Sequence, residues 1–112
     1  MAFDPHFSGL SPRFVDQLKT YCAANKKVKK VILFGSRARG EHRQTSDIDL
    51  AIETEQASHS QQNLIEDAIR EIPTPLKVDV LFVDRLENED LIGDIMREGV
   101  VIYDQGETSP QT

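Results

Sequence analysis

The stretch from Val31 to Glu53 constrains the fold more than any other part of this sequence. An apolar run leads into the turn Gly35-Ser36, and after a polar linker a second apolar run carries Asp47 and Asp49, here called the aspartate pair. Because side chains alternate between the two faces of a strand, the pair points to one face and the apolar residues around it point to the other. Two like charges about 4 Å apart repel by roughly 4 kcal/mol at a surface-like dielectric. A fold that places them together therefore usually puts a cation between them.

Length and charge limit the classes of protein that this chain can belong to. Its 112 residues fit one compact domain. A net charge of −6 argues against a broad nucleic-acid surface. No apolar run approaches the roughly 20 residues that span a bilayer, and residues 1–6 lack the features of a signal peptide. We expect a cytoplasmic protein with no membrane segment, whose single cysteine, Cys22, is a small core residue.

Hydrophobic periodicity and turn residues predict alternating helices and strands. The expected order is a helix at 12–24, a strand at 28–34, a turn and short helix at 35–40, a strand at 47–53, a helix after residue 58, a strand at 76–84, a helix after residue 88 and a strand at 100–103. This order predicts an α/β fold, with a mixed β-sheet of about four strands and helices packed on it. A single domain should cover residues 11–103, preceded by a flexible arm at 1–10 and followed by a disordered tail at 104–112.

Two of the predicted helices carry apolar residues at helical spacing, which should form their buried stripes. The stripe of the helix after residue 58 should consist of Leu64, Ile65, Ala68, Ile69 and Ile72. The stripe of the helix after residue 88 should consist of Leu91, Ile92, Ile95 and Met96.

A third acid, Asp79, lies inside the apolar strand at 76–84, where an unpartnered carboxylate is costly. If this strand and the one at 47–53 are neighbours, Asp79 can reach the aspartate pair. Three converging carboxylates would supply the hard oxygen ligands that suit Mg²⁺, which completes its shell with waters and substrate phosphates. Two such ions can activate an attacking oxygen and stabilise a leaving pyrophosphate. Asp84, at the end of the same strand, is expected to serve the turn.

The turn at residues 35–40, here called the glycine turn, follows a predicted strand and opens a predicted helix. This is the geometry in which backbone N–H groups hold a phosphate. Gly35 and Gly40 also have the separation of the P-loop glycines. However, Glu41 and His42 follow, where a P-loop needs Lys and then Ser or Thr. The turn is therefore not a P-loop.

Together these residues resemble a known signature. Gly35-Ser36, ten intervening residues and then Asp47-Ile48-Asp49 resemble the motif of the DNA polymerase β-like nucleotidyltransferase superfamily. The fuller strings Phe-Gly-Ser-Arg-Ala-Arg-Gly and Ser-Asp-Ile-Asp-Leu look like its minimal nucleotidyltransferase (MNT) branch, and the resemblance covers roughly residues 28–83.

The resemblance implies a role for each matching position. Ser36 and the Gly35 backbone would bind the terminal phosphates of ATP. The aspartate pair would hold the metal, with two Mg²⁺ ions expected, and Asp79 would be the third carboxylate, near the acceptor hydroxyl. Arg37 and Arg39 match basic positions of the family turn, so each is either a phosphate contact or a surface arginine.

The same resemblance implies a partner and an activity. MNT proteins commonly associate with a small helical HEPN protein, often an RNase toxin. The MNT antitoxin can transfer AMP from ATP to a tyrosine of that toxin. Two alternatives stay open, namely a nucleotidyltransferase for a small molecule or RNA with a separate helical subunit, and an antitoxin that neutralises its partner by binding alone. No short motif in the sequence identifies the acceptor or the base that the nucleotide site prefers.

Overall fold

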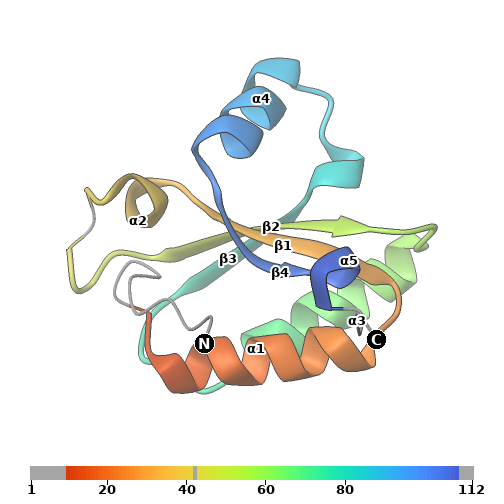
Figure 1. Cartoon of the computed structure of the whole chain (residues 1–112), viewed down its shortest axis with the longest axis horizontal. Helices are drawn as coiled ribbons and strands as arrows, with labels where there is room; N and C mark the ends of the chain where they lie inside the picture. Colours follow the sequence, from red (N-terminus) through yellow and green to blue (C-terminus); the bar gives the residue numbers. More distant parts are fainter. Residues whose placement is uncertain (1–9, 42, 109–112) are drawn as a thin grey trace.

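A four-stranded mixed sheet organises the protein, with strand order β3-β2-β1-β4 (Figure 1). The computed structural model describes residues 10–41 and 43–108. Its elements are α1 (Pro12–Ala24), β1 (Val28–Phe34), α2 (Ser36–Arg39), β2 (Ile48–Thr54), α3 (His59–Arg70), β3 (Val78–Phe82), the 3₁₀ helix η1 (Val83–Arg85), α4 (Glu89–Glu98), β4 (Val100–Asp104) and α5 (Gln105–Thr108). Strand β1 is antiparallel to β2 and β4, and β2 is parallel to β3. The predicted α/β fold and its mixed sheet are confirmed.

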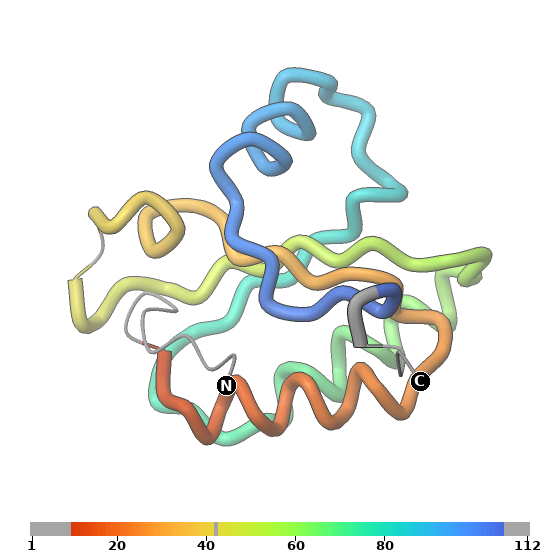
Figure 2. The backbone as a smooth tube through the Cα atoms, in the orientation of Figure 1, coloured from red at the N-terminus to blue at the C-terminus, as the bar shows by residue number. Residues whose placement is uncertain are grey.

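The sheet has two faces that are covered to different extents. Helices α1 and α3 lie side by side below it in Figure 1 and enclose the larger core, whereas α4 lies above it. Figure 2 shows the chain leaving β3, forming α4 and returning as β4. The core beneath α4 is small and is built around Ile32, Ala51 and Ile95. Part of this second face therefore stays open, and the candidate site lies there.

The nearly continuous apolar sequence of β1 follows from its central place in the sheet. Val31 and Leu33 belong to the larger core, and Ile32, between them, belongs to the smaller one. Each of these three side chains is at most 2% exposed. A strand that is buried on both faces needs apolar residues at successive positions, as the sequence predicted.

The helix starts are encoded locally. Ser11 accepts hydrogen bonds from the backbone N–H groups of Arg13 and Phe14, and Asn88 accepts one from Leu91. Ser58 and Gln61 form a capping box at the start of α3. The burial predicted for Cys22 is also confirmed, since its side chain lies wholly within the larger core. Among the described residues, no helix has both the length and the hydropathy of a bilayer-crossing segment.

The predicted helix stripes were partly wrong. Ile65 and Ile69 of α3 are buried, but Leu64 is 67% exposed and Gln62 is buried in its place. The buried positions of α3 therefore follow a narrower stripe that includes a polar residue, whose amide donates a hydrogen bond to Thr54 Oγ1. In α4, Met96 is 45% exposed because only one side of this short helix contacts the sheet.

The predicted ends of the domain also need correction. Leu10, placed in the flexible arm, is 6% exposed and belongs to the larger core, while residues 1–9 lie outside the described part. The predicted tail was wrong for residues 104–108, since Asp104 is the last residue of β4 and pairs with Lys30 of β1. In α5, the Gln105 amide donates hydrogen bonds to the carbonyls of Lys26 and Val28, which fixes the segment to β1. Residues 109–112 lie outside the described part of the chain.

Candidate active site

Asp49 lies near the start of β2, on the open face of the sheet. Its neighbours in β2, Ile48 and Leu50, point into the larger core, so the half-buried Asp49 side chain points to the α4 side. Across the sheet it is in register with Asp79 of β3 and with Phe34 at the end of β1. The adjacency of β2 and β3, on which the sequence interpretation depended, is confirmed.

The charges of the other two predicted carboxylates act on Asp49. Burial raises the pKa of Asp49, and the charges of Asp79 and then Asp47 raise it further, while Lys77 opposes them. Asp79 is in register with Asp49 and has an ion pair with Lys77 at 3.7 Å. Asp47 is exposed and comes directly before β2, so the predicted strand start at Asp47 was one residue too early. The structure therefore gathers the negative charge of three aspartates on the open face of the sheet.

Gly35 brings the glycine turn into contact with this acidic group. Its backbone has φ +78° and ψ −155°, a region that is essentially restricted to glycine. A Cβ atom at this position would lie 2.5 Å from Asp49 Oδ2, so the carboxylate occupies the space that a side chain would need. Ser36 follows at once as the first residue of α2, where a helix start leaves backbone N–H groups without intrahelical acceptors. The turn and the acids thus form one site.

Arg37 is not a surface arginine, and its contact with phosphate stays a prediction. Its side chain is only 2% exposed, so the surface alternative was wrong. The guanidinium donates hydrogen bonds to the carbonyls of Arg43, Gln44 and Ser46, at 3.1–3.3 Å. These contacts hold the loop that leads from α2 to Asp47. Arg37 is therefore a positioning residue for the loop.

Arg39 is the exposed arginine of the turn. It pairs with Glu41 at 3.0 Å and with Glu98 of α4 at 3.8 Å. Together with Gly35, it borders a cavity of about 230 Å³ between the end of β1, α2 and α4. The other lining residues are Phe34, Leu91, Asp94, Ile95 and Glu98. Of the two arginines, Arg39 is the one whose charge is open to a bound phosphate.

The family follows from the sequence of the whole domain. A family model described as "Polymerase beta, Nucleotidyltransferase" matches residues 16–108. The chain belongs to this nucleotidyltransferase family. The prediction made from the Gly-Ser and Asp-x-Asp motif is thereby confirmed, and the acidic group described above lies within the matched range.

Other known proteins are similar to this nucleotidyltransferase. A Methanocaldococcus jannaschii protein named "Putative protein adenylyltransferase MJ1215" is 59% identical over 29 residues, which are 26% of this chain and 34% of the relative. The match thus spans about a third of that curated protein's length. A crystal structure of a toxin–antitoxin with AMP-PNP superposes with a TM-score of 0.64 at 17% identity, covering 88% of this chain and 77% of the other. A mutant of the toxin–antitoxin MntA-HpeT gives 0.62 at 16% identity, with 88% and 76% covered. At these identities the two structures show a shared fold.

The carboxylates of Asp47, Asp49 and Asp79 suit a divalent cation that prefers oxygen ligands. Within residues 10–41 and 43–108, no three His, Cys, Asp or Glu side chains are already arranged as a metal cluster. Mg²⁺ does not require one, because it is commonly bound through one or two carboxylates together with waters and substrate phosphates. Asp49, in register with Asp79 and two residues after Asp47, can supply such a pair with either neighbour. The two-ion site stays a prediction.

The remaining polar cluster near the sheet is structural. Asp84 accepts hydrogen bonds from the backbone N–H and the hydroxyl of Thr54, at the opposite end of β2 from Asp49. Gln62 continues this cluster through the Thr54 hydroxyl and accepts a hydrogen bond from Arg85. Asp84 therefore joins η1 to the end of β2, as expected of a turn residue.

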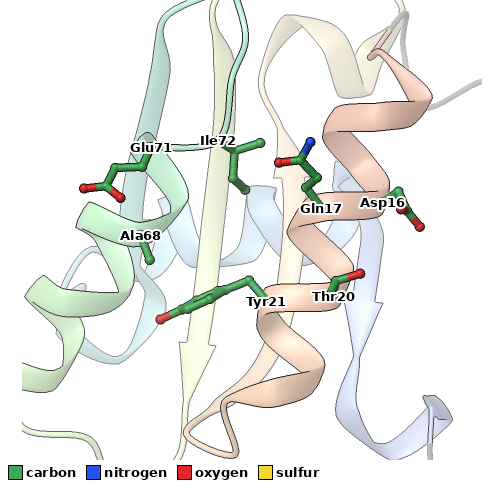
Figure 3. Close-up of a pocket in the computed structure, with 7 residues that line it drawn as sticks. All are labelled: Asp16, Gln17, Thr20, Tyr21, Ala68, Glu71 and Ile72. Atoms are coloured by element: carbon green, nitrogen blue, oxygen red, sulfur yellow. The ribbon is translucent and has the colours of Figure 1, made fainter.

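A second hollow, of about 520 Å³, lies away from Asp47, Asp49 and Asp79. Figure 3 shows it between α1 and α3, with Tyr21 and Gln17 of α1 facing Ala68 of α3 and Ile72, which follows α3. These helices cover the face of the sheet opposite to Asp49. The hollow is therefore separate from the nucleotidyltransferase site.

Proposed function

We propose that this nucleotidyltransferase is a Mg²⁺-dependent protein adenylyltransferase, which transfers AMP from ATP to a tyrosine hydroxyl of a HEPN-type toxin and thereby acts as its antitoxin. The observation that carries the proposal is the contact between the Gly35 turn and the Asp49 carboxylate, with Asp79 in register beside it. Phosphate-binding and metal-binding groups are thus adjacent, as the transfer of a nucleotide requires.

The geometry supports a division of roles among the residues of the site. Ser36 and the start of α2 bind the terminal phosphates, and Arg39 neutralises part of their charge. The aspartate pair holds Mg²⁺, which would offset the charge on the triphosphate and on the departing pyrophosphate. Asp79 accepts the proton of the acceptor hydroxyl. That oxygen forms a bond to the α-phosphorus, and the bond between the α-phosphorus and the oxygen bridging to the β-phosphate breaks.

Support for a protein acceptor comes from the relatives. The name of the Methanocaldococcus jannaschii protein describes a putative protein adenylyltransferase, and the two crystal structures reported above are each described as a toxin–antitoxin. One of them contains AMP-PNP, an analogue of ATP. The net charge of −6 also disfavours RNA as the acceptor.

The test is to co-express the protein with a small helical HEPN-type protein encoded beside it, and to measure the mass of the purified HEPN-type partner after incubation with ATP and Mg²⁺. We expect the partner to gain the mass of one or more AMP groups, and tandem mass spectrometry should place them on tyrosine. The Asp47→Ala, Asp49→Ala double variant should leave the partner unmodified. The circular dichroism spectrum of the variant should match that of the wild-type protein.

Two results would contradict the proposal. If only an added small molecule or RNA is adenylated, the acceptor is not a protein. If the double variant still protects cells from the toxin fully, neutralisation depends on binding and not on transfer.

Omitting Mg²⁺ from the reaction should stop the transfer of AMP by the wild-type protein.

A further inference from the structure

The cavity between α2 and α4, here called the α4 cavity, adjoins the proposed phosphate site, because Gly35 borders both. Phe34, Leu91 and Ile95 form its apolar walls, and Arg39, Asp94 and Glu98 supply its charged groups. Its volume of about 230 Å³ lies below the range of about 300–1,000 Å³ typical of pockets for whole drug-sized ligands. It therefore suits a single ring system and not an entire nucleotide.

We propose that the α4 cavity holds the base of the nucleoside triphosphate, with the sugar and phosphates leading from it to Gly35 and Ser36. This inference rests on the proposed function. It assigns the selectivity of the site for a nucleotide, as opposed to a bare polyphosphate, to residues of α4, which lie outside the family motif, and to Phe34, which directly precedes its Gly-Ser.

The chemistry of the walls favours a base over a phosphate. Phe34 and Leu91 are half-buried and Ile95 is fully buried, so they offer an apolar surface to the flat face of a base. Aromatic and apolar faces bind bases without needing a particular hydrogen-bond pattern. Both carboxylates at the cavity already have a cationic partner, since Asp94 pairs with Arg97 and Glu98 pairs with Arg39 at 3.8 Å. The apolar walls and the paired carboxylates favour a neutral group with N–H donors inside the cavity.

The strand order keeps the base and the acceptor apart. The α4 cavity lies at the end of β1, whereas Asp79 is on β3, and β2 with Asp49 runs between them. A base in the cavity therefore leaves the β3 side of the sheet free. The acceptor hydroxyl can approach Asp79 from that side while the nucleotide is bound.

The test compares the binding of MgATP and of magnesium tripolyphosphate by isothermal titration calorimetry. Leu91→Trp fills the cavity with a larger side chain. Asp94→Trp also fills it, and because Asp94 is exposed, this substitution should disturb folding less. Met96→Trp is the matched control, because Met96 is on the same helix, is 45% exposed and does not line the cavity. Thermal unfolding of each variant checks that it is folded.

We expect Leu91→Trp and Asp94→Trp to weaken MgATP binding by roughly tenfold or more, since base stacking accounts for free energies of this order. Tripolyphosphate binding should stay within about twofold of wild type, and Met96→Trp should change neither ligand. If folded Leu91→Trp and Asp94→Trp bind MgATP as wild type does, the base lies elsewhere and the inference is wrong, although the phosphate site stands. If wild-type protein binds neither ligand, the proposed function itself fails.

Discussion

Replacing Gly35 with alanine would test the contact on which the proposed site depends. The backbone there has φ +78° and ψ −155°, which residues with a side chain rarely adopt. The new Cβ would lie 2.5 Å from Asp49 Oδ2 and 3.4 Å from Asp49 Cγ. Alanine therefore strains the turn and also pushes the carboxylate out of its position.

The two effects can be given magnitudes. Holding a non-glycine residue in this backbone region costs about 1–3 kcal/mol, and overpacking a filled space adds about 1–3 kcal/mol. The expected loss of about 2–6 kcal/mol compares with a total stability of about 5–15 kcal/mol for a typical protein. Most of the variant should still fold. Because a displacement of about 1 Å in a site can lower the rate about a hundredfold, AMP transfer should fall by at least that factor.

Gly40→Ala is the matched control. Gly40 also has a positive φ, +74°, but a Cβ there would meet nothing within 4 Å. Its cost should be the backbone strain alone, about 1–2 kcal/mol, with transfer nearly unchanged. Urea unfolding and AMP transfer would be measured for both variants, and for Gly35→Ala in an Asp49→Ala background, where the clash is removed and the stability loss should shrink. If Gly35→Ala matched Gly40→Ala in stability and activity, the proposed contact with Asp49 would be refuted.

Three further predictions concern ionisable side chains. Burial and the neighbouring carboxylates raise the pKa of Asp49, so the folded protein binds a proton at this carboxylate more tightly than the unfolded chain does. The free energy of unfolding should therefore fall as pH rises from about 3.9 through the raised pKa. Asp49→Asn should remove that part of the pH dependence in urea titrations and should not destabilise the protein at neutral pH; an unchanged slope would contradict this. Arg37→Ala should cost about 2–4 kcal/mol in urea unfolding, because part-buried carbonyls such as that of Ser46 lose a charged donor, whereas Arg39→Ala, at an exposed position, should cost much less. Burial raises the pKa of Cys22 to about 12, so a thiol reagent such as Ellman's should react at neutral pH only as the protein unfolds, and prompt reaction of the native protein would disprove this.

Much of the fold could be predicted because its signals are local. Ser11 before Pro12 fixes the start of α1, and the apolar run at residues 31–34 of β1 indicates a central strand. The errors arose where the partner of a side chain is distant in sequence. Leu64 has the right spacing for a core position, but contacts made by Gln62 with the end of β2 set which side of α3 faces inward.

The sequence by itself determined the chemistry of this protein, namely a Gly-Ser turn, three aspartates and an alternation that places the aspartate pair on one side of a strand. Only the tertiary structure decided that Asp79 lies in register with Asp49, that Gly35 leaves room for that carboxylate, and that Arg37 is buried. The α4 cavity likewise exists only because α4 folds back over the end of β1. The physical reason is the separation along the chain of the residues that interact. Alternation along a strand is set by neighbouring residues, whereas strand order and helix packing depend on contacts between residues far apart in the chain.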